Sequence, residues 1–182
     1  MRLVQYHIHF HHYLHTKDFN MIKIIVALDN KNGLAKNGII PWKCPEDMKF
    51  FRKTTQNNTV IMGNKTWKTL PCQLKDRTNI VIAHNQFADD IYPYFDGLGL
   101  RVYANSPQKA LDFAKHLDED IYIIGGLSIY KQYLDMGVVD ELIVTHINNK
   151  YNCDLFFPSF PEYYCYKQQK LSDMAEVRYY VK

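Results

Sequence analysis

The sequence predicts a three-layer α/β fold, in which a central, twisted, mostly parallel sheet of eight strands carries helices on both faces. Short apolar runs bounded by Gly, Asn or Asp recur along the chain from Met21. Helical stretches stand between most of these runs, which is the order typical of a parallel sheet. The last three strand-like runs have no helix between them, and this pattern favours an antiparallel C-terminal edge.

The first predicted strand, Ile22 to Leu28, is apolar enough to be a central strand buried on both faces. Further strands are expected at 59–62, 79–83, 100–103, 121–124, 141–147, 163–171 and 176–182. The segment 86–99 is predicted to be a long loop, and we assign it no role.

Four helices are predicted between the strands. The first begins at Pro45, because a proline lacks only an N–H that is unpaired at the first helical position, and it runs to about Thr55. Ser106 is a favourable cap for the third. The other three helices are expected at 66–70, 107–116 and 127–134.

Length and charge limit the class of protein. A chain of 182 residues is expected to form one main domain that buries about two-thirds of its unfolded surface. Its 22 basic and 19 acidic residues give a net charge of +3 without a long basic run, so we expect no nucleic-acid partner. No apolar run approaches the roughly 20 residues of a membrane span, so we expect no membrane partner either.

The four cysteines, at positions 44, 72, 153 and 165, form no C-x-x-C pair and no zinc-like spacing. We therefore expect free thiols in a reducing compartment, the cytoplasm, and no metal site.

Residues 1–20 differ from the rest of the chain. Five histidines crowd this segment, and apolar residues alternate with polar ones from Val4 to Phe10, as in an added strand or a metal-binding tract. The charged start, apolar core and cleavage site of a secretory signal are absent. We expect a poorly ordered extension, because the regular pattern begins only at Met21.

One acid stands out in the first turn of the first predicted helix. Asp47 lies five residues after Trp42 and shares a helix face with Phe51. An acid at this place also offsets the helix dipole, which is all that Glu46 does, so helix capping is an alternative role for Asp47. Its aromatic neighbours favour a slot for a flat, basic ring.

Two glycine turns are candidate phosphate sites. Ile121 to Tyr130 is a predicted strand that ends in Gly125-Gly126 and leads into a helix. Val60 to Trp67 repeats the arrangement around Gly63, with a cation and a hydroxyl beside it. Each is also compatible with an ordinary strand-to-helix turn, and neither reads G-x-G-x-x-G. Two such turns in one sheet suit a ligand with separated phosphates.

From Met21 to Lys182 the chain resembles the dihydrofolate reductases. Four motifs carry the resemblance, in the order found in that family: Gly38 to Trp42 with Asp47, Val60 to Trp67, Ile121 to Tyr130, and Thr145 to Ile147 followed by Asp154 to Pro158.

The resemblance implies a dihydrofolate reductase-like fold and the NADPH-dependent reduction of 7,8-dihydrofolate to tetrahydrofolate, with hydride passing to C6 and a proton to N5. Asp47 matches the acid that binds N3 and the 2-amino group of the pterin. Trp42 matches the residue that orders water beside this acid. Thr145, by itself an ordinary strand threonine, matches the hydroxyl that bonds the carboxylate.

The resemblance also assigns a substrate site. Arg77 matches the guanidinium that binds the α-carboxylate of the substrate. Without the resemblance, Arg77 would be taken for a surface arginine. The positions that match the apolar lining, and that would otherwise be taken as core residues, are Ile25, Ala27, Met48, Phe51, Leu70, Leu74 and Ile124.

For NADPH, the family's Gly125-Gly126 peptide is cis, and the 2′-phosphate end departs from the family pattern. Asn64 stands where the family often has a basic residue, and Ala83 and His84 replace common hydroxyl or basic side chains. Lys65, assisted by His84, would then favour NADPH over NADH by a reduced margin. The matching cofactor positions are Ala27, Leu34, Gly63, Lys65, Thr66, His84, Ile124, Gly125, Gly126 and Tyr130.

The loop before Pro41 departs from the family as well, because Ala35 stands where glycine is common. Asp154 matches the acid that closes this loop through hydrogen bonds to its backbone.

Two other functions stay open. A related pterin or pyrimidine reductase on the same fold would share the cofactor site but not the pair of Trp42 and Asp47. A non-catalytic NADPH- or folate-binding component of an assembly could use residues 1–20 as a docking arm. We expect a monomeric enzyme.

Overall fold

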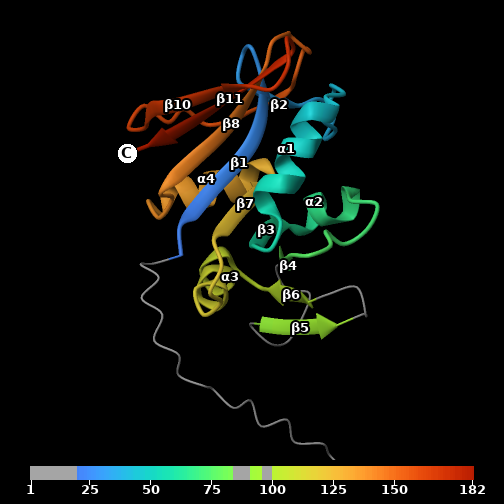
Figure 1. Cartoon of the computed structure of the whole chain (residues 1–182). Helices are drawn as coiled ribbons and strands as arrows, with labels where there is room; N and C mark the ends of the chain where they lie inside the picture. Colours follow the sequence, from blue (N-terminus) through green and yellow to red (C-terminus); the bar gives the residue numbers. More distant parts are fainter. Residues whose placement is uncertain (1–19, 84–90, 96–99) are drawn as a thin grey trace, which may run out of the picture.

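A computed structural model of the chain describes residues 20–83, 91–95 and 100–182. Within these residues, nine strands form one twisted sheet that runs through the molecule (Figure 1). In spatial order the strands are β10 (Tyr164–Lys170), β11 (Ala175–Val181), β8 (Glu141–Ile147), β1 (Ile22–Asp29), β7 (Ile121–Gly125), β3 (Thr59–Gly63), β4 (Thr78–Ile82), β6 (Leu100–Ala104) and β5 (Ile91–Phe95).

The centre of this sheet is parallel. Strand β1 pairs in parallel with β7 on one side and β8 on the other, and β3 continues the parallel order from β7 to β4. The chain then reverses at the edge, where β11 pairs antiparallel with β8 and β10 pairs antiparallel with β11. The predicted parallel centre and antiparallel C-terminal edge are therefore confirmed.

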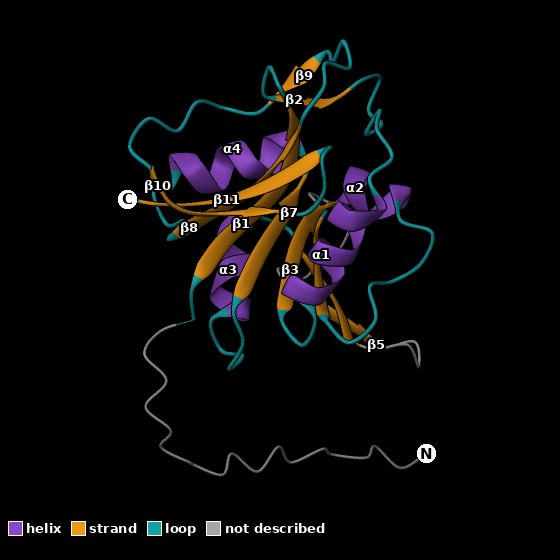
Figure 2. Cartoon of the chain, turned by 45° about the horizontal axis from the view of Figure 1, so that its top comes forward, coloured by secondary structure: helices purple, strands orange, loops and turns teal. Residues whose placement is uncertain are grey.

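Helices α1 (Pro45–Thr55) and α2 (Asn64–Thr69) cover one face of the sheet, and α3 (Pro107–Ala114) and α4 (Leu127–Asp135) cover the other (Figures 1 and 2). The period of two along each strand produces these layers. In β1, Ile24 faces the cluster built with α3 and α4, and Ile25 faces the cluster that includes α1.

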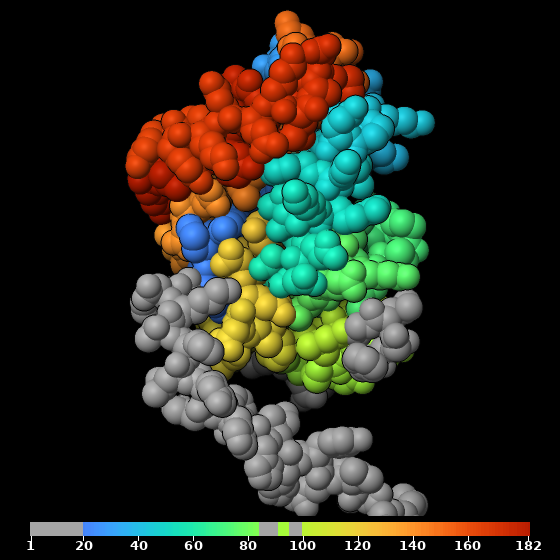
Figure 3. Space-filling model, viewed as in Figure 1, coloured from blue at the N-terminus to red at the C-terminus, as the bar shows by residue number. Residues whose placement is uncertain are grey.

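One face of the sheet is only partly covered by helix. Figure 3 shows the C-terminal hairpin in red beside α1 in cyan, and residues of β11 share a hydrophobic cluster with Phe50 and Phe51 of α1. Strand β11 and helix α1 thus contribute to the same apolar layer on this face of the sheet.

Strand β5 was missed by the sequence analysis, which assigned its residues to the long loop 86–99. Pro93 lies in the middle of β5, and a proline argues against a central strand because it cannot donate to the ladder. Here β5 pairs only with β6, at the edge of the sheet, where an unpaired side of the strand tolerates proline. The sheet therefore has nine strands rather than the predicted eight.

A second sheet of two short strands was also missed. Strand β2 (Gly33–Ala35) pairs antiparallel with β9 (Leu155–Phe156). Both strands are too short to give a periodic signal in the sequence. Ala35, the residue at the family's glycine position, lies in β2 and is buried.

The predicted helices exist, with small differences at their ends. Helix α1 has the predicted bounds, α2 begins two residues early at Asn64, and α3 ends at Ala114 instead of His116. Ser106 caps α3 by accepting a hydrogen bond from the N–H of Lys109. The N-terminal segment 1–19, with its histidines, lies outside the described residues.

No helix within the described ranges is both long and apolar enough to cross a membrane.

The core makes a first prediction. Ile123, in β7, is completely buried, so replacing it with alanine removes apolar contacts and leaves a cavity in the core. Ile123→Ala is expected to lower the free energy of unfolding by about 2–5 kcal/mol. Urea titration followed by circular dichroism measures this. The control Lys131→Ala, on the exposed surface of α4, is expected to stay within about 0.5 kcal/mol; an equal loss in both variants would contradict the assigned core.

Candidate active site

Asp47 lies in the first turn of α1 and is half-buried against the sheet. Burial raises the pKa of Asp47 above the ordinary carboxyl value, and a hydrogen bond from the Thr145 side chain partly offsets this rise. Thr145 is a buried residue of β8. The structure thus brings the first helical turn and β8 together around one carboxylate, and Asp47 does not simply cap its helix in solvent.

Two further predicted residues lie at the same end of the sheet. Ala27 of β1 is the register partner of Thr145, and Trp42 is 7% exposed. Trp42 belongs to a hydrophobic cluster against which Ala27 packs. Tyr151 also packs on Trp42, with ring centroids 5.4 Å apart and planes inclined by 56°.

Most of the predicted folate lining gathers on the α1 face of the sheet. Phe51, Leu70, Leu74 and Ile124 are partly buried and pack against the cluster that contains Ile25. Met48 differs, because it is 59% exposed. It lies next to Asp47 in sequence, so a bound ligand rather than the protein core would have to cover it.

Arg77 is held in place by two hydrogen bonds. Its Nε donates to the carbonyl oxygen of Lys75 at 2.9 Å, and its Nη1 donates to Oγ1 of Thr55 at 2.9 Å. Burial lowers the pKa of Arg77, the carboxylate of Asp76 raises it, and the charge of Arg52 lowers it. Arg52 and Arg77 therefore place two guanidinium groups near the end of α1, an arrangement suited to a carboxylate.

The two glycine turns are neighbours. Gly125 at the end of β7 is the register partner of Met62, which precedes Gly63 in β3. The peptide bond between Gly125 and Gly126 is cis, as the resemblance implied, and Gly125 has φ +114°. A phosphate-bearing ligand would meet both turns at one edge of the sheet.

Side chains at the glycine positions would be crowded by residues assigned to the cofactor site. A Cβ on Gly125 would lie 3.1 Å from the Tyr130 hydroxyl, and one on Gly126 would lie 3.2 Å from Oγ1 of Thr66. Helices α2 and α4 both begin without a side-chain cap at these turns. At α4, which is nine residues long, the helix N-terminus can therefore face an anion.

Tyr130 links the glycine turn to the acid. Its hydroxyl donates to the carbonyl oxygen of Ile25 at 3.0 Å. Burial raises the pKa of Tyr130, and the charge of Asp47 raises it further. The Tyr130 hydroxyl, which lies beside Gly125, is therefore close enough to Asp47 for an electrostatic interaction.

A family model described as dihydrofolate reductase matches residues 21–181. The chain belongs to the dihydrofolate reductase family. A dihydrofolate reductase of Haemophilus influenzae is 35% identical over 135 residues, which are 74% of this chain and 77% of the relative. One of Buchnera aphidicola subsp. Schizaphis graminum is 36% identical over 141 residues, 76% of this chain and 80% of the relative.

A solved structure of the dihydrofolate reductase from Enterococcus faecalis, complexed with NADP(H) and RAB-propyl, has the same fold. It superposes with a TM-score of 0.72 and 25% sequence identity, over 88% of this chain and 95% of that one. The fold and family inferred from the motifs are thus confirmed.

The family's loop contact between Asp154 and the backbone is present. The N–H of Asn37 donates to Oδ2 of Asp154 at 2.8 Å, and the N–H of Asp154 donates to the carbonyl oxygen of Ala35 at 3.0 Å. Leu34, which precedes Ala35 in β2, packs against the hydrophobic cluster that contains Tyr130.

The 2′-phosphate end was assigned two basic side chains, Lys65 and His84. Lys65 lies exposed in the first turn of α2, and His84 lies outside the described residues. In the ranges that the structure describes, no cluster of three or more His, Cys, Asp or Glu residues could hold a metal ion.

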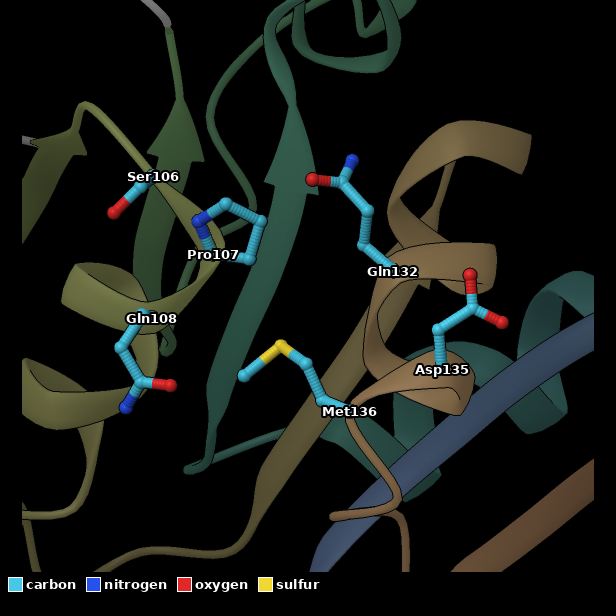
Figure 4. A pocket seen from close by; sticks show the side chains of 6 residues that line it. All are labelled: Ser106, Pro107, Gln108, Gln132, Asp135 and Met136. Carbon is cyan, nitrogen blue, oxygen red and sulfur yellow. The ribbon is translucent and has the colours of Figure 1, made fainter.

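Two cavities lie away from this site. One of about 430 Å³ lies between α3 and α4, lined by residues such as Pro107 and Met136 (Figure 4). The other, of about 390 Å³, has a polar lining that includes His146 and Arg178. Neither includes a residue assigned to the folate or cofactor site.

Sequence reasoning missed Asp29 and Tyr151. Asp29, the last residue of β1, is 2% exposed and accepts hydrogen bonds from the backbone of two loops. A single acid that ends an otherwise apolar strand was a signal for a buried, hydrogen-bonded carboxylate. The contact between Tyr151 and Trp42 carried no sequence signal, because 109 residues of chain separate the two rings.

The raised pKa of Asp47 makes a prediction about stability. A carboxyl whose pKa is raised on folding destabilises the folded state once pH rises above that pKa, and the penalty disappears below the ordinary value. Asp47→Asn is therefore expected to raise the melting temperature at pH 7, with a smaller gain at pH 3. Calorimetry of both proteins tests this; an equal gain at both pH values would contradict the assigned burial cost.

Proposed function

We propose that the chain carries out the reaction of its family, the NADPH-dependent reduction of 7,8-dihydrofolate to 5,6,7,8-tetrahydrofolate, at the site around Asp47. The observation that carries this proposal is a half-buried carboxylate, bonded to Thr145, at the same edge of the sheet as the paired glycine turns. Tetrahydrofolate serves one-carbon metabolism and nucleotide synthesis.

Asp47 is the acid that holds the pterin in this proposal. Its two oxygens accept hydrogen bonds from N3 and the 2-amino group, while the Thr145 hydroxyl keeps the carboxylate oriented. When bound, NADPH supplies the hydride that C6 receives. The negative charge of Asp47 stabilises the ring as N5 takes its proton, and Trp42 orders the water beside the acid.

The residues at the glycine turns fit the cofactor. Gly125 and Gly126 pack closely on Tyr130 and Thr66, where a Cβ would be crowded, and this turn at the start of α4 would bind the pyrophosphate through its backbone N–H groups. Ala27, Leu34 and Ile124 would line the nicotinamide side, and Gly63, Thr66 and Lys65 the adenosine phosphate side. Lys65, with His84, would supply the preference for the 2′-phosphate.

The apolar residues on the α1 face fit the substrate. The aminobenzoyl ring of the substrate would lie between α1 and the 70–74 segment, with Met48 and Phe51 on the helix side and Leu70 and Leu74 opposite. Arg77 would bind the α-carboxylate, because its hydrogen bonds already fix the guanidinium.

Other proposals concern the context of the reaction. We expect a monomeric, cytoplasmic enzyme with no nucleic-acid partner. The match of the family model from residue 21 supports a reductase domain at 21–182 preceded by an extension of residues 1–20.

The two alternatives make different predictions. A pterin or pyrimidine reductase on this fold would share the cofactor site but not the pair of Trp42 and Asp47, so the presence of both residues favours dihydrofolate. A non-catalytic component would bind NADPH without oxidising it. A turnover assay separates these cases.

The purified chain is expected to oxidise NADPH in the presence of dihydrofolate, and Asp47→Asn is expected to lower kcat/KM on the order of a hundredfold or more, because a positioned charge is lost. Absorbance at the NADPH band measures both. The matched control is Glu46→Gln, which removes an exposed acid from the same helical turn and should act like the parent. Equal turnover by Asp47→Asn and the parent would rule out the assigned role.

Lys65→Ala tests the cofactor end. Loss of a cation at the 2′-phosphate is expected to raise the KM for NADPH on the order of tenfold and to leave that for NADH unchanged. Steady-state kinetics with each cofactor measures this, with Lys68→Ala as an exposed lysine control on the same helix. Parity between NADPH and NADH in the parent would refute the preference.

A further inference from the structure

The buried carboxylate of Asp29 takes no part in the reaction described above, yet it joins two loops that border the site. Its Oδ1 accepts hydrogen bonds from the N–H groups of Lys31 and Gly33, both at 2.8 Å. Its Oδ2 accepts one from the N–H of Tyr151 at 3.0 Å, and the Cys153 thiol lies 3.7 Å from the same oxygen. The Asp29 side chain therefore binds backbone N–H groups of both segments that lead into the paired strands β2 and β9.

Asp29 stays charged in this place. Burial opposes its ionisation, but the N–H groups of Tyr151, Lys31 and Gly33 together outweigh burial and lower its pKa below the ordinary carboxyl value. Hydrogen bonds to an ionised acceptor are stronger than those between neutral groups. A charged clamp of this kind limits the separation of the two loops at neutral pH.

Both loops lead to residues of the active site. The segment 30–37 continues through Ile39 to Pro41 and Trp42, and its Asn37 donates to Asp154. The segment 148–154 carries Tyr151, whose ring packs on Trp42. The Asp29 carboxylate is thus connected to Trp42 in two ways, through the chain that follows the segment 30–37 and through the ring of Tyr151.

We propose that Asp29 is a positioning residue of the active site: its buried carboxylate ties the segment 30–37 to the segment 148–154 and thereby fixes Trp42 at the substrate pocket. The inference rests on the proposed function for its consequence in turnover, but the clamp itself is a property of the chain without ligand. It differs from the exposed contact of Asp154, because Asp29 is 2% exposed and water competes little for its oxygens.

Hydrogen–deuterium exchange of the full chain without ligand is the direct test. In Asp29→Ala, amides in 30–37 and 148–154 are expected to exchange about tenfold faster or more, as expected when a hydrogen bond to a charged group is lost. Amides of β7 and β3 should keep the protection of the parent.

The variant Asp29→Asn separates the hydrogen bonds of Oδ1 from the hydrogen bond of Oδ2. An asparagine oxygen at the Oδ1 position can still accept from Lys31 and Gly33, but an amide nitrogen at the Oδ2 position cannot accept from Tyr151. Faster exchange is therefore expected in 148–154 and little change in 30–33. This variant also decides the question if Asp29→Ala does not fold.

Ile24→Val is the matched stability control, because Ile24 lies in the same strand but faces α3 and α4. It should speed exchange across the whole sheet without a selective effect on the two loops. The inference is overturned if Asp29→Asn and Asp29→Ala leave the loops as protected as in the parent, or if they speed loops and sheet equally, as Ile24→Val does.

Turnover gives the functional readout. Asp29→Asn is expected to lower kcat/KM for dihydrofolate about tenfold, whereas Ile24→Val should keep the parent value at a temperature where both are folded. If the parent protein does not reduce dihydrofolate, the proposed function fails. The hydrogen–deuterium exchange data then still test whether Asp29 holds the two loops together. Selective loop opening with an unchanged kcat/KM would reject the positioning role.

Discussion

The active site depends on one constraint of the sheet, the parallel placement of β7 between β1 and β3. Parallel neighbours end at the same edge, so Gly125 at the end of β7 and Gly63 at the end of β3 meet there. Ala27 and Thr145 lie toward the same ends of β1 and β8. Helix α1 lies on one face of this sheet, and its first turn brings Asp47 beside Thr145. Binding at the carboxyl ends of parallel strands is general for open α/β sheets.

The same edge carries groups that oppose folding. Burial raises the pKa of Asp47, so the charged form of this residue opposes folding, and Gly125 adopts a backbone conformation that a residue with a side chain rarely takes. Neither feature contributes to the hydrophobic core, which lies further back along the strands around Ile61 and Ile123. A rigid sheet therefore supports a site whose own residues are selected for chemistry and close approach.

Much of this arrangement could be predicted from the sequence, because the strands are apolar and the helices have clear starts. Asp47, Thr145 and the two glycine turns were found through motifs whose order in the chain is that of a known family. The elements and residues that the sequence did not reveal were missed for physical reasons. Pro93 hid an edge strand, and β2 and β9 are too short to show a period. Asp29 and Tyr151 act through backbone and ring contacts between distant segments, which residue patterns do not encode.

The tight fit around Gly33 has a consequence for how this chain can change. A Cβ at position 33 would lie 2.7 Å from both Oδ1 of Asp29 and Sγ of Cys153. Any side chain there would have to displace the acid, the thiol or both, so these three positions are expected to vary as a set. Selection for folded protein from a library that randomises position 33 alone should return glycine. A library that also randomises positions 29 and 153 could return other sets of three residues that pack together at this place.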